Sequence, residues 1–145
     1  MIVVPDTSIL VPFIVSKRGY TAFIRRLWNA GTVRFAVSPS ILAEIEHTLS
    51  YGHIQKRHGR TRYQVRKFIK QLNQRSLMTT EKVSVDVVAE DPDDNKFLAC
   101  AVEAKADAVV SLDPHLLSLK SFQGIPIITP QQCVEQLKSK AGHAA

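Results

Sequence analysis

The chain of 145 residues lacks several features that would mark it as secreted, membrane-bound or zinc-binding. It has only two cysteines, Cys100 and Cys133, which make neither a disulfide framework nor a zinc pattern, and we interpret both as small buried hydrophobic residues. No apolar run approaches the roughly 20 residues that cross a bilayer. The first residues show no secretory signal. These absences favour a cytoplasmic protein without a membrane partner.

A second absence concerns charge. The formal net charge is +6, and no aspartate or glutamate occurs between His47 and Thr80. Protein surfaces usually mix both signs, whereas a stretch of one positive sign attracts phosphate backbones whatever their sequence. A solvated helical face is the simpler interpretation. We predict nucleic-acid contact through the basic residues of this stretch, namely Lys56, Arg57, Arg60, Arg62, Arg66, Lys67 and Lys70.

The apolar pattern alternates between strands and helices. Short apolar runs predict strands at 2–5, 33–37, 83–88, 108–112 and 125–129. Helical spacing predicts helices at 9–15, 21–30, 39–49, 62–74, 92–105 and 130–137. Such alternation is typical of an α/β protein with a mostly parallel sheet and helices on both faces. We expect one domain over residues 1–138 and a flexible C-terminal tail at 139–145.

Four acidic residues stand where predicted strands end or helices begin. Asp6 and Asp113 directly follow strands, and Glu44 and Asp94 lie in early helical turns. Parallel sheets bind ligands at the carboxyl ends of their strands, so the four carboxylates should gather at one edge. Carboxylates that lie close together need protons or a cation. In a basic protein this pattern indicates a metal-dependent site that acts on a strongly anionic substrate.

Helix capping is the simpler interpretation of most of these acids. Asp91 and Asp113 each precede a proline, which is typical of a helix N-cap. Asp6 does not fit this explanation, because it directly follows an apolar strand and no lysine or arginine precedes Lys17. Burial of an unpartnered carboxylate is costly. A metal ion or a basic residue distant in sequence would remove that cost.

Oxygen ligands select hard cations such as Mg²⁺. A magnesium site beside a basic groove suits phosphodiester hydrolysis, in which the metal activates water and no protein nucleophile is needed. The chain offers no nucleophile elbow, cysteine–histidine pairing or glycine-rich phosphate loop. The residues themselves therefore favour metal-assisted hydrolysis over nucleophilic catalysis.

Five segments, in order along the chain, carry a combined signature. They are 3–10, 38–45, 91–101, 108–117 and 124–130, and the sequence DPDDNKFLACA at 91–101 is the most specific. Together they resemble the PIN-domain ribonucleases, in particular the VapC-like toxins of toxin–antitoxin systems. The resemblance implies a three-layer α/β/α sandwich, cleavage of RNA with Mg²⁺ or Mn²⁺, an antitoxin partner and a homodimer.

The family's functional residues can be carried over by position. Its catalytic acids match Asp6, Glu44, Asp94 and Asp113, with Asp6, Asp94 and Asp113 as metal ligands and Asp93 as a reserve for Asp94. The hydroxyl that follows the first aspartate matches Thr7 or Ser8. Ser8 stands where related chains often have asparagine, and Ser111-Leu112 stands where Thr-Gly is frequent. We expect these departures to tune the site, because serine keeps a hydroxyl.

Two other functions stay open at this level. A phosphatase of the haloacid-dehalogenase kind would use Asp6 as its nucleophile, but it expects a second aspartate where this chain has Ser8. A non-catalytic RNA-binding or interaction domain would use the acids only as helix caps, and its binding of RNA would not depend on metal.

Overall fold

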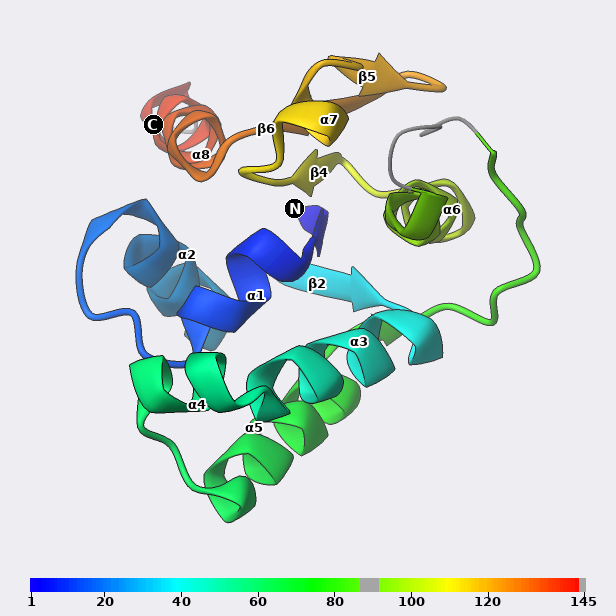
Figure 1. Ribbon diagram of the computed structural model, residues 1–145. Helices are drawn as coiled ribbons and strands as arrows, with labels where there is room; N and C mark the ends of the chain where they lie inside the picture. Colours follow the sequence, from blue (N-terminus) through cyan, green and yellow to red (C-terminus); the bar gives the residue numbers. More distant parts are fainter. Residues whose placement is uncertain (87–91, 144–145) are drawn as a thin grey trace.

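A six-stranded sheet forms the centre of the computed structural model, which describes residues 1–86 and 92–143 (Figure 1). In chain order the strands are β1 (Ile2–Pro5), β2 (Arg34–Val37), β3 (Leu77–Met78), β4 (Ala108–Val110), β5 (Ser121–Phe122) and β6 (Ile125–Ile128). Across the sheet the order is β3-β2-β1-β4-β6-β5, and only the β5–β6 pair is antiparallel. The predicted α/β class with a mostly parallel sheet is confirmed.

Helices cover both faces of this sheet. They are α1 (Thr7–Phe13), α2 (Gly19–Asn29), α3 (Pro39–Ser50), α4 (Gly52–His58), α5 (Arg62–Arg75), α6 (Asn95–Ala104), α7 (Pro114–Leu117) and α8 (Pro130–His143), with a 3-10 turn η1 (Pro92–Asp94) before α6. Figure 1 shows α2 and α8 on one side of the sheet, α6 on the other, and α3, α4 and α5 together beyond β2. The three-layer arrangement implied by the resemblance is confirmed.

The register of the two central strands positions the functional edge. Pro5 of β1 pairs with Val110 of β4, so the next residues, Asp6 and Ser111, leave the sheet side by side. Both strands are buried over nearly their whole length, as expected for parallel strands covered on both faces. The polar residues that follow them are therefore placed by an apolar, rigid support.

An aromatic cluster joins the helices to the sheet. The ring of Phe13 in α1 lies 5.6 Å from the rings of Trp28 in α2 and Phe35 in β2, and 6.0 Å from the ring of Phe68 in α5. Phe13 and Phe35 are fully buried. Such aromatic pairs add to the hydrophobic stabilisation of their burial, and here they fix α1, α2 and α5 relative to one another.

Local signals explain where several helices begin and end. The Ser38 hydroxyl caps α3 by accepting from the amide of Ile41. Thr61 and Gln64 form a capping box at the start of α5. Gly31 follows α2 with a φ of 82°, the left-handed conformation expected of a glycine that ends a helix.

The short strands were predicted less well than the helices. The run at 83–88 was expected to be a strand, but residues 83–86 are not in a strand, and residues 87 and 88 lie outside the described residues. The strand in this part of the chain is β3, which has only two residues and so shows no alternating pattern. The two-residue β5, which pairs with β6, escaped prediction for the same reason.

Several helix ends also differ from the prediction. The first helix begins at Thr7, two residues before Ile9, and α6 begins at Asn95 after the 3-10 turn. Helix α8 continues through His143, beyond Leu137 and into the segment expected to be a tail. Within the described parts of the chain, no helix has the length and apolar character needed to span a membrane.

Candidate active site

Asp6 lies at the carboxyl end of the central strand β1 with only 2% of its surface exposed. Ser8 Oγ donates a hydrogen bond of 2.5 Å to Asp6 Oδ1, and Ser111 Oγ donates one to Oδ2. Burial raises the pKa of the Asp6 carboxyl and outweighs the lowering by these two hydroxyls, while the charge of Asp113 raises it further. Two neutral hydroxyls thus hold the carboxylate, where the sequence had suggested a metal or a basic residue.

The same two hydroxyls also bind the turn that follows β4. Ser111 Oγ accepts from the backbone amide of Asp113 at 2.8 Å, and Ser8 Oγ accepts from the amide of Leu112 at 2.9 Å. A hydroxyl can donate and accept at once, which a lysine ammonium cannot do. Each serine therefore fixes Asp6 and the backbone around Asp113 with a single side chain.

Capping explains Asp113 but not Asp6. Asp113 is the N-cap of α7, and its Oδ1 accepts from the amide of His115 at 2.9 Å. Asp6 occupies the N-cap position of α1, yet its side chain makes no capping hydrogen bond. A role of Asp6 other than capping stays a prediction, and a side-chain capping bond does not account for its position.

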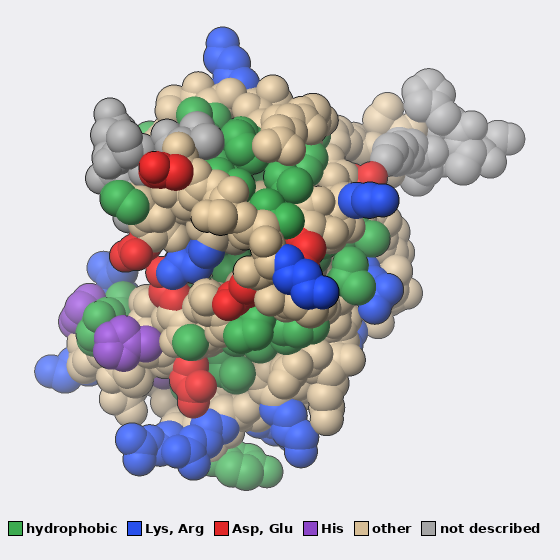
Figure 2. Space-filling view, turned by 90° about the vertical axis from the view of Figure 1, so that its right-hand side faces the viewer, with side chains coloured by type: hydrophobic (Ala, Val, Ile, Leu, Met, Phe, Trp, Pro, Cys, Tyr) green, Lys and Arg blue, Asp and Glu red, His purple; other side chains and the backbone are tan. Residues whose placement is uncertain are grey.

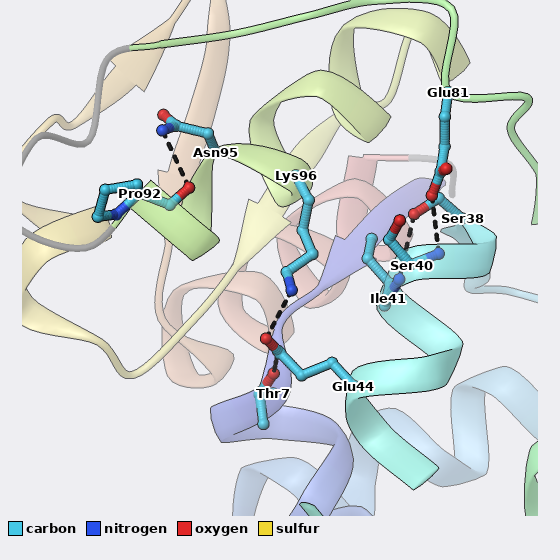
Figure 3. Close-up of polar contacts among 9 residues, drawn as sticks. All are labelled: Thr7, Ser38, Ser40, Ile41, Glu44, Glu81, Pro92, Asn95 and Lys96. Atoms are coloured by element: carbon cyan, nitrogen blue, oxygen red, sulfur yellow. Dashed lines mark hydrogen bonds and ion pairs between the residues drawn. The ribbon is translucent and has the colours of Figure 1, made fainter. Parts of the chain in front are cut away.

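Glu44 lies in the second turn of α3 and is held at both carboxylate oxygens. Lys96 Nζ is 2.6 Å from Oε1, and Thr7 Oγ1 donates to Oε2 (Figure 3). The side chains of Lys96 and Glu44 are half-buried, with 23% and 26% of their surfaces exposed. The contacts bring together residues from α1, α3 and α6.

Lys96 was not predicted as a site residue. Its position was visible in the sequence, because it lies two residues after Asp94 within the most specific segment of the signature. Its partner was not visible, since Glu44 is 52 residues away in sequence. Only the packing of α3 beside α6 places the two side chains together.

Asp93 and Asp94 differ in their surroundings. Asp94, at the junction of η1 and α6, is 9% exposed, whereas Asp93 is on the surface. Asn95 Nδ2 donates to the carbonyl of Pro92 at 3.0 Å and closes this turn (Figure 3). Asp94 is thus the more buried of the two, and the choice between them as a metal ligand stays a prediction. Asp91, expected to be an N-cap, lies outside the described residues.

The surface around the candidate site carries charges of both signs. On the face shown in Figure 2, acidic side chains form a band across the middle, with lysine and arginine side chains among them and along the lower border. The predicted nucleic-acid contacts lie on α4, on α5 and between them. Lys56, Arg57, Arg62, Arg66, Lys67 and Lys70 are exposed, and Arg60 is half-buried.

Arg75, at the end of the same basic stretch, has a structural role instead. Its guanidinium lies 3.7 Å from the centre of the Trp28 ring and donates to the carbonyl of Trp28 and to Asn29 Oδ1. It ties the end of α5 to the end of α2. This member of the basic stretch is therefore engaged in packing two helices.

The donor set of the site fits a hard cation by its chemistry. The candidate ligands offer carboxylate oxygens, and the Asp6 carboxylate keeps acceptor positions beyond its two hydroxyl bonds. Among the described residues, no three histidine, cysteine, aspartate or glutamate side chains form a cluster that could hold an ion by themselves. Mg²⁺ needs only one or two carboxylates when water and substrate phosphate supply the other ligands.

A family model for the PIN domain matches residues 2–115, most of the chain. The chain belongs to the PIN domain family. Comparison of this PIN domain with curated proteins gave no match. Among solved structures, the complex VapBC2 from Rickettsia felis, bound to a DNA fragment from its promoter, contains a similar chain. The TM-score is 0.59 at 14% identity over 89% of this chain and 98% of that chain, a likeness that concerns the fold.

Proposed function

We propose that this PIN domain is a divalent-metal-dependent endoribonuclease and the toxin of a toxin–antitoxin pair. The observation that carries the proposal is the buried Asp6 carboxylate, which Ser8 and Ser111 fix at the carboxyl edge of the sheet although it makes no capping hydrogen bond to α1. A buried acid without a structural partner of opposite charge is typical of a functional site. Membership of the PIN family supports nuclease chemistry.

Asp6, Asp94 and Asp113 are the proposed ligands of Mg²⁺ or Mn²⁺, with Asp93 as a reserve. A bound divalent ion would polarise a phosphodiester oxygen and help to deprotonate a water molecule. The charge of Asp113 already opposes ionisation of Asp6, so a cation between such carboxylates would be electrostatically favoured. The hydroxyl of Ser8 would keep Asp6 in a fixed orientation before any ion binds.

Glu44, Lys96 and Thr7 form the second part of the proposed site. Lys96 and Thr7 each hold one oxygen of Glu44, so the carboxylate cannot rotate freely. Because Lys96 is only half-buried, its ammonium can also contact a phosphate oxygen of a bound strand. We infer that Glu44 is catalytic and that Lys96 orients it and attracts the substrate.

The proposed substrate is RNA. This choice of substrate rests on the family resemblance and on the basic side chains of α4 and α5. The structural neighbour is a VapBC complex bound to promoter DNA. A partner antitoxin for this chain is inferred from that likeness. The homodimer and the cytoplasmic location remain predictions from the sequence.

The test compares wild-type protein with Asp6→Asn and with the matched control Asp86→Asn, which changes an exposed aspartate. Each protein is incubated with a labelled RNA and Mn²⁺, with and without excess chelator. We expect cleavage by the wild type and the control, none by Asp6→Asn, and none in chelator. Circular dichroism should show that all three proteins are folded. Full activity of Asp6→Asn, or cleavage undiminished by chelator, would refute the proposal.

A further inference from the structure

A basic cleft of about 350 Å³ lies between α1, α2 and α5, away from the carboxylates. Arg25 belongs to α2, and Arg60 precedes α5. Lys67 lies in the second turn of α5. Among residues 1–86 and 92–143, no aspartate or glutamate lines the cleft. Three cations from separate parts of the chain therefore face one small volume without a neutralising acid.

Arg25 is the central residue of this cleft. Its guanidinium lies 4.7 Å from the centre of the Phe13 ring, and it makes a long hydrogen bond of 3.4 Å to the carbonyl of Ser16. Burial lowers the pKa of Arg25, and the charge of Arg60 lowers it further. Both guanidiniums line the same cleft, and among the described residues neither forms an ion pair with an acid.

The floor of the cleft is rigid. Phe13 and Phe68 stack there, and both are buried. A guanidinium that lies against an aromatic ring keeps its N–H groups in a fixed plane and presents them as a fork. This is the geometry that binds a phosphate through two parallel hydrogen bonds.

We propose that the cleft of Arg25, Arg60 and Lys67 binds a backbone phosphate of the RNA strand whose scissile bond lies at the Asp6 site. The inference rests on the proposed function, because it treats the strand as that enzyme's substrate. Helix α1 connects the two places, since Thr7 at its start contacts Glu44 and Phe13 at its end forms the cleft floor. At 1.5 Å per residue this helix spans about 10 Å, so one strand can reach both.

Continuity of charge favours a nucleic acid over other anions. Arg60 and Lys67 belong to the stretch between His47 and Thr80 that has no acidic residue. Lys67 also lines a neighbouring hollow of about 500 Å³ on α5, together with Arg66 and Lys70. An extended polyanion can contact the cleft and this surface together, whereas a single small anion cannot.

The experiment measures binding of a labelled single-stranded RNA of about 12 nucleotides, a length in the range of single-strand binding sites, in chelator so that no cleavage occurs. The variants are Arg25→Gln and Arg60→Gln. The matched control is Arg26→Gln, an exposed neighbour on α2 that faces Phe23 and does not line the cleft. We expect about tenfold weaker binding for each cleft variant, as for the loss of a charge-assisted hydrogen bond. The slope of log affinity against log salt concentration should become less steep by the amount expected for about one phosphate contact.

Thermal unfolding tests whether a variant binds RNA more weakly only because its fold is destabilised. Arg25→Gln loses a ring contact with Phe13 and a long hydrogen bond to Ser16, and Arg26→Gln loses a ring contact with Phe23. The two variants should therefore have similar melting temperatures. Binding of Arg25→Gln that equals binding of Arg26→Gln would overturn the proposal. A decrease in melting temperature that accounts for the weaker binding of both cleft variants would overturn it as well.

Two competitors distinguish the sources of the anion. The first competitor is inorganic phosphate, added to the wild type at a concentration equal to that of RNA phosphate. If it displaces the RNA, the cleft is a site for small anions, and the assignment to a strand is overturned. The second competitor is a glutamate-rich peptide of equal charge. If it binds as tightly as RNA and loses the same affinity in Arg25→Gln, the assignment to nucleic acid is overturned. We expect neither competitor to match RNA.

The two proposals fail in different ways. If the cleft variants lose RNA affinity in chelator but no RNA is ever cleaved by the wild type, the cleft is an RNA-binding site, while the nuclease assignment and the position of the scissile bond fail. If the wild type cleaves RNA with metal while Arg25→Gln binds and cleaves like Arg26→Gln, the nuclease stands and the cleft proposal fails.

Discussion

Replacement of Ser111 by alanine tests the idea that hydroxyls, and not a basic residue, hold the central carboxylate. Ser111 is fully buried, donates to Asp6 Oδ2 and accepts from the amide of Asp113. Alanine would remove both bonds from a place that water does not readily reach. A hydrogen bond to a charged group contributes about 1.5–3 kcal/mol, and an ordinary one about 1 kcal/mol. We expect Ser111→Ala to lower the free energy of unfolding by about 2–4 kcal/mol at pH 7.

The pH dependence gives this prediction a second readout. The folded-state pKa of Asp6 is raised above the unfolded value of 3.8, so the folded protein binds more protons in the window between the two pKa values. The contribution of Asp6 to stability therefore falls as pH rises through this window. The Ser111 hydroxyl lowers the pKa of Asp6, and its loss should widen the window upward. Hence Ser111→Ala should lose more stability at pH 7 than at pH 4.

The assay is urea unfolding followed by circular dichroism at both pH values. The matched control is Ser118→Ala, which removes an exposed hydroxyl that donates to the carbonyl of His115. Exposed substitutions of this kind stay within about 0.5 kcal/mol of the wild type. A loss for Ser111→Ala below about 1 kcal/mol, or an equal loss at both pH values, would refute the reasoning about the buried hydroxyl.

Two further predictions concern Lys96 and the cysteines. Lys96→Met should strongly reduce RNA cleavage but lower the free energy of unfolding by less than about 1 kcal/mol, because its ion pair with Glu44 keeps 23% and 26% of the two side-chain surfaces exposed to solvent. Lys105→Met, an exposed change at the end of the same helix, should alter neither cleavage nor stability. Normal cleavage by Lys96→Met would contradict its proposed role. Burial raises the pKa of the Cys100 and Cys133 thiols to about 11, so neither should react with a thiol reagent at pH 8 until the protein is unfolded in urea. Rapid labelling of the native protein would show that these side chains are not buried as described.

The elements with a periodic pattern could be predicted from the sequence. Helix α5 shows apolar residues at helical spacing and begins with a capping box, and both signals are local. Strands β3 and β5 have two residues each, and their pairing depends on neighbours that are distant in sequence. Local patterns contain no information about such pairing. The missed strands are therefore those that tertiary contacts create.

In the candidate site, too, local signals could be identified from the sequence and contacts between distant residues could not. Asp6 and Asp113 could be found because each follows an apolar strand. The contacts that hold them could not be found, because Ser111 reaches Asp6 across 105 residues and Lys96 reaches Glu44 across 52. Ser111 had been noticed only as a departure from the family pattern. In the structure its hydroxyl, together with that of Ser8, links the ends of β1 and β4.

The two serines explain how a buried carboxylate can stay available for a ligand. An arginine or lysine paired with Asp6 would neutralise it and compete with any cation for the same oxygens. Hydroxyls stabilise the charge only in part, and the pKa of Asp6 remains raised despite them. The carboxylate is thus oriented but not neutralised, and a bound cation would lower its pKa and stabilise the fold at once. The charge arrangement of the basic cleft is the converse, since Arg25 and Arg60 both line it and no acid among the described residues does. Both places keep charge uncompensated in the free protein, and a metal ion with a phosphodiester strand would compensate both together.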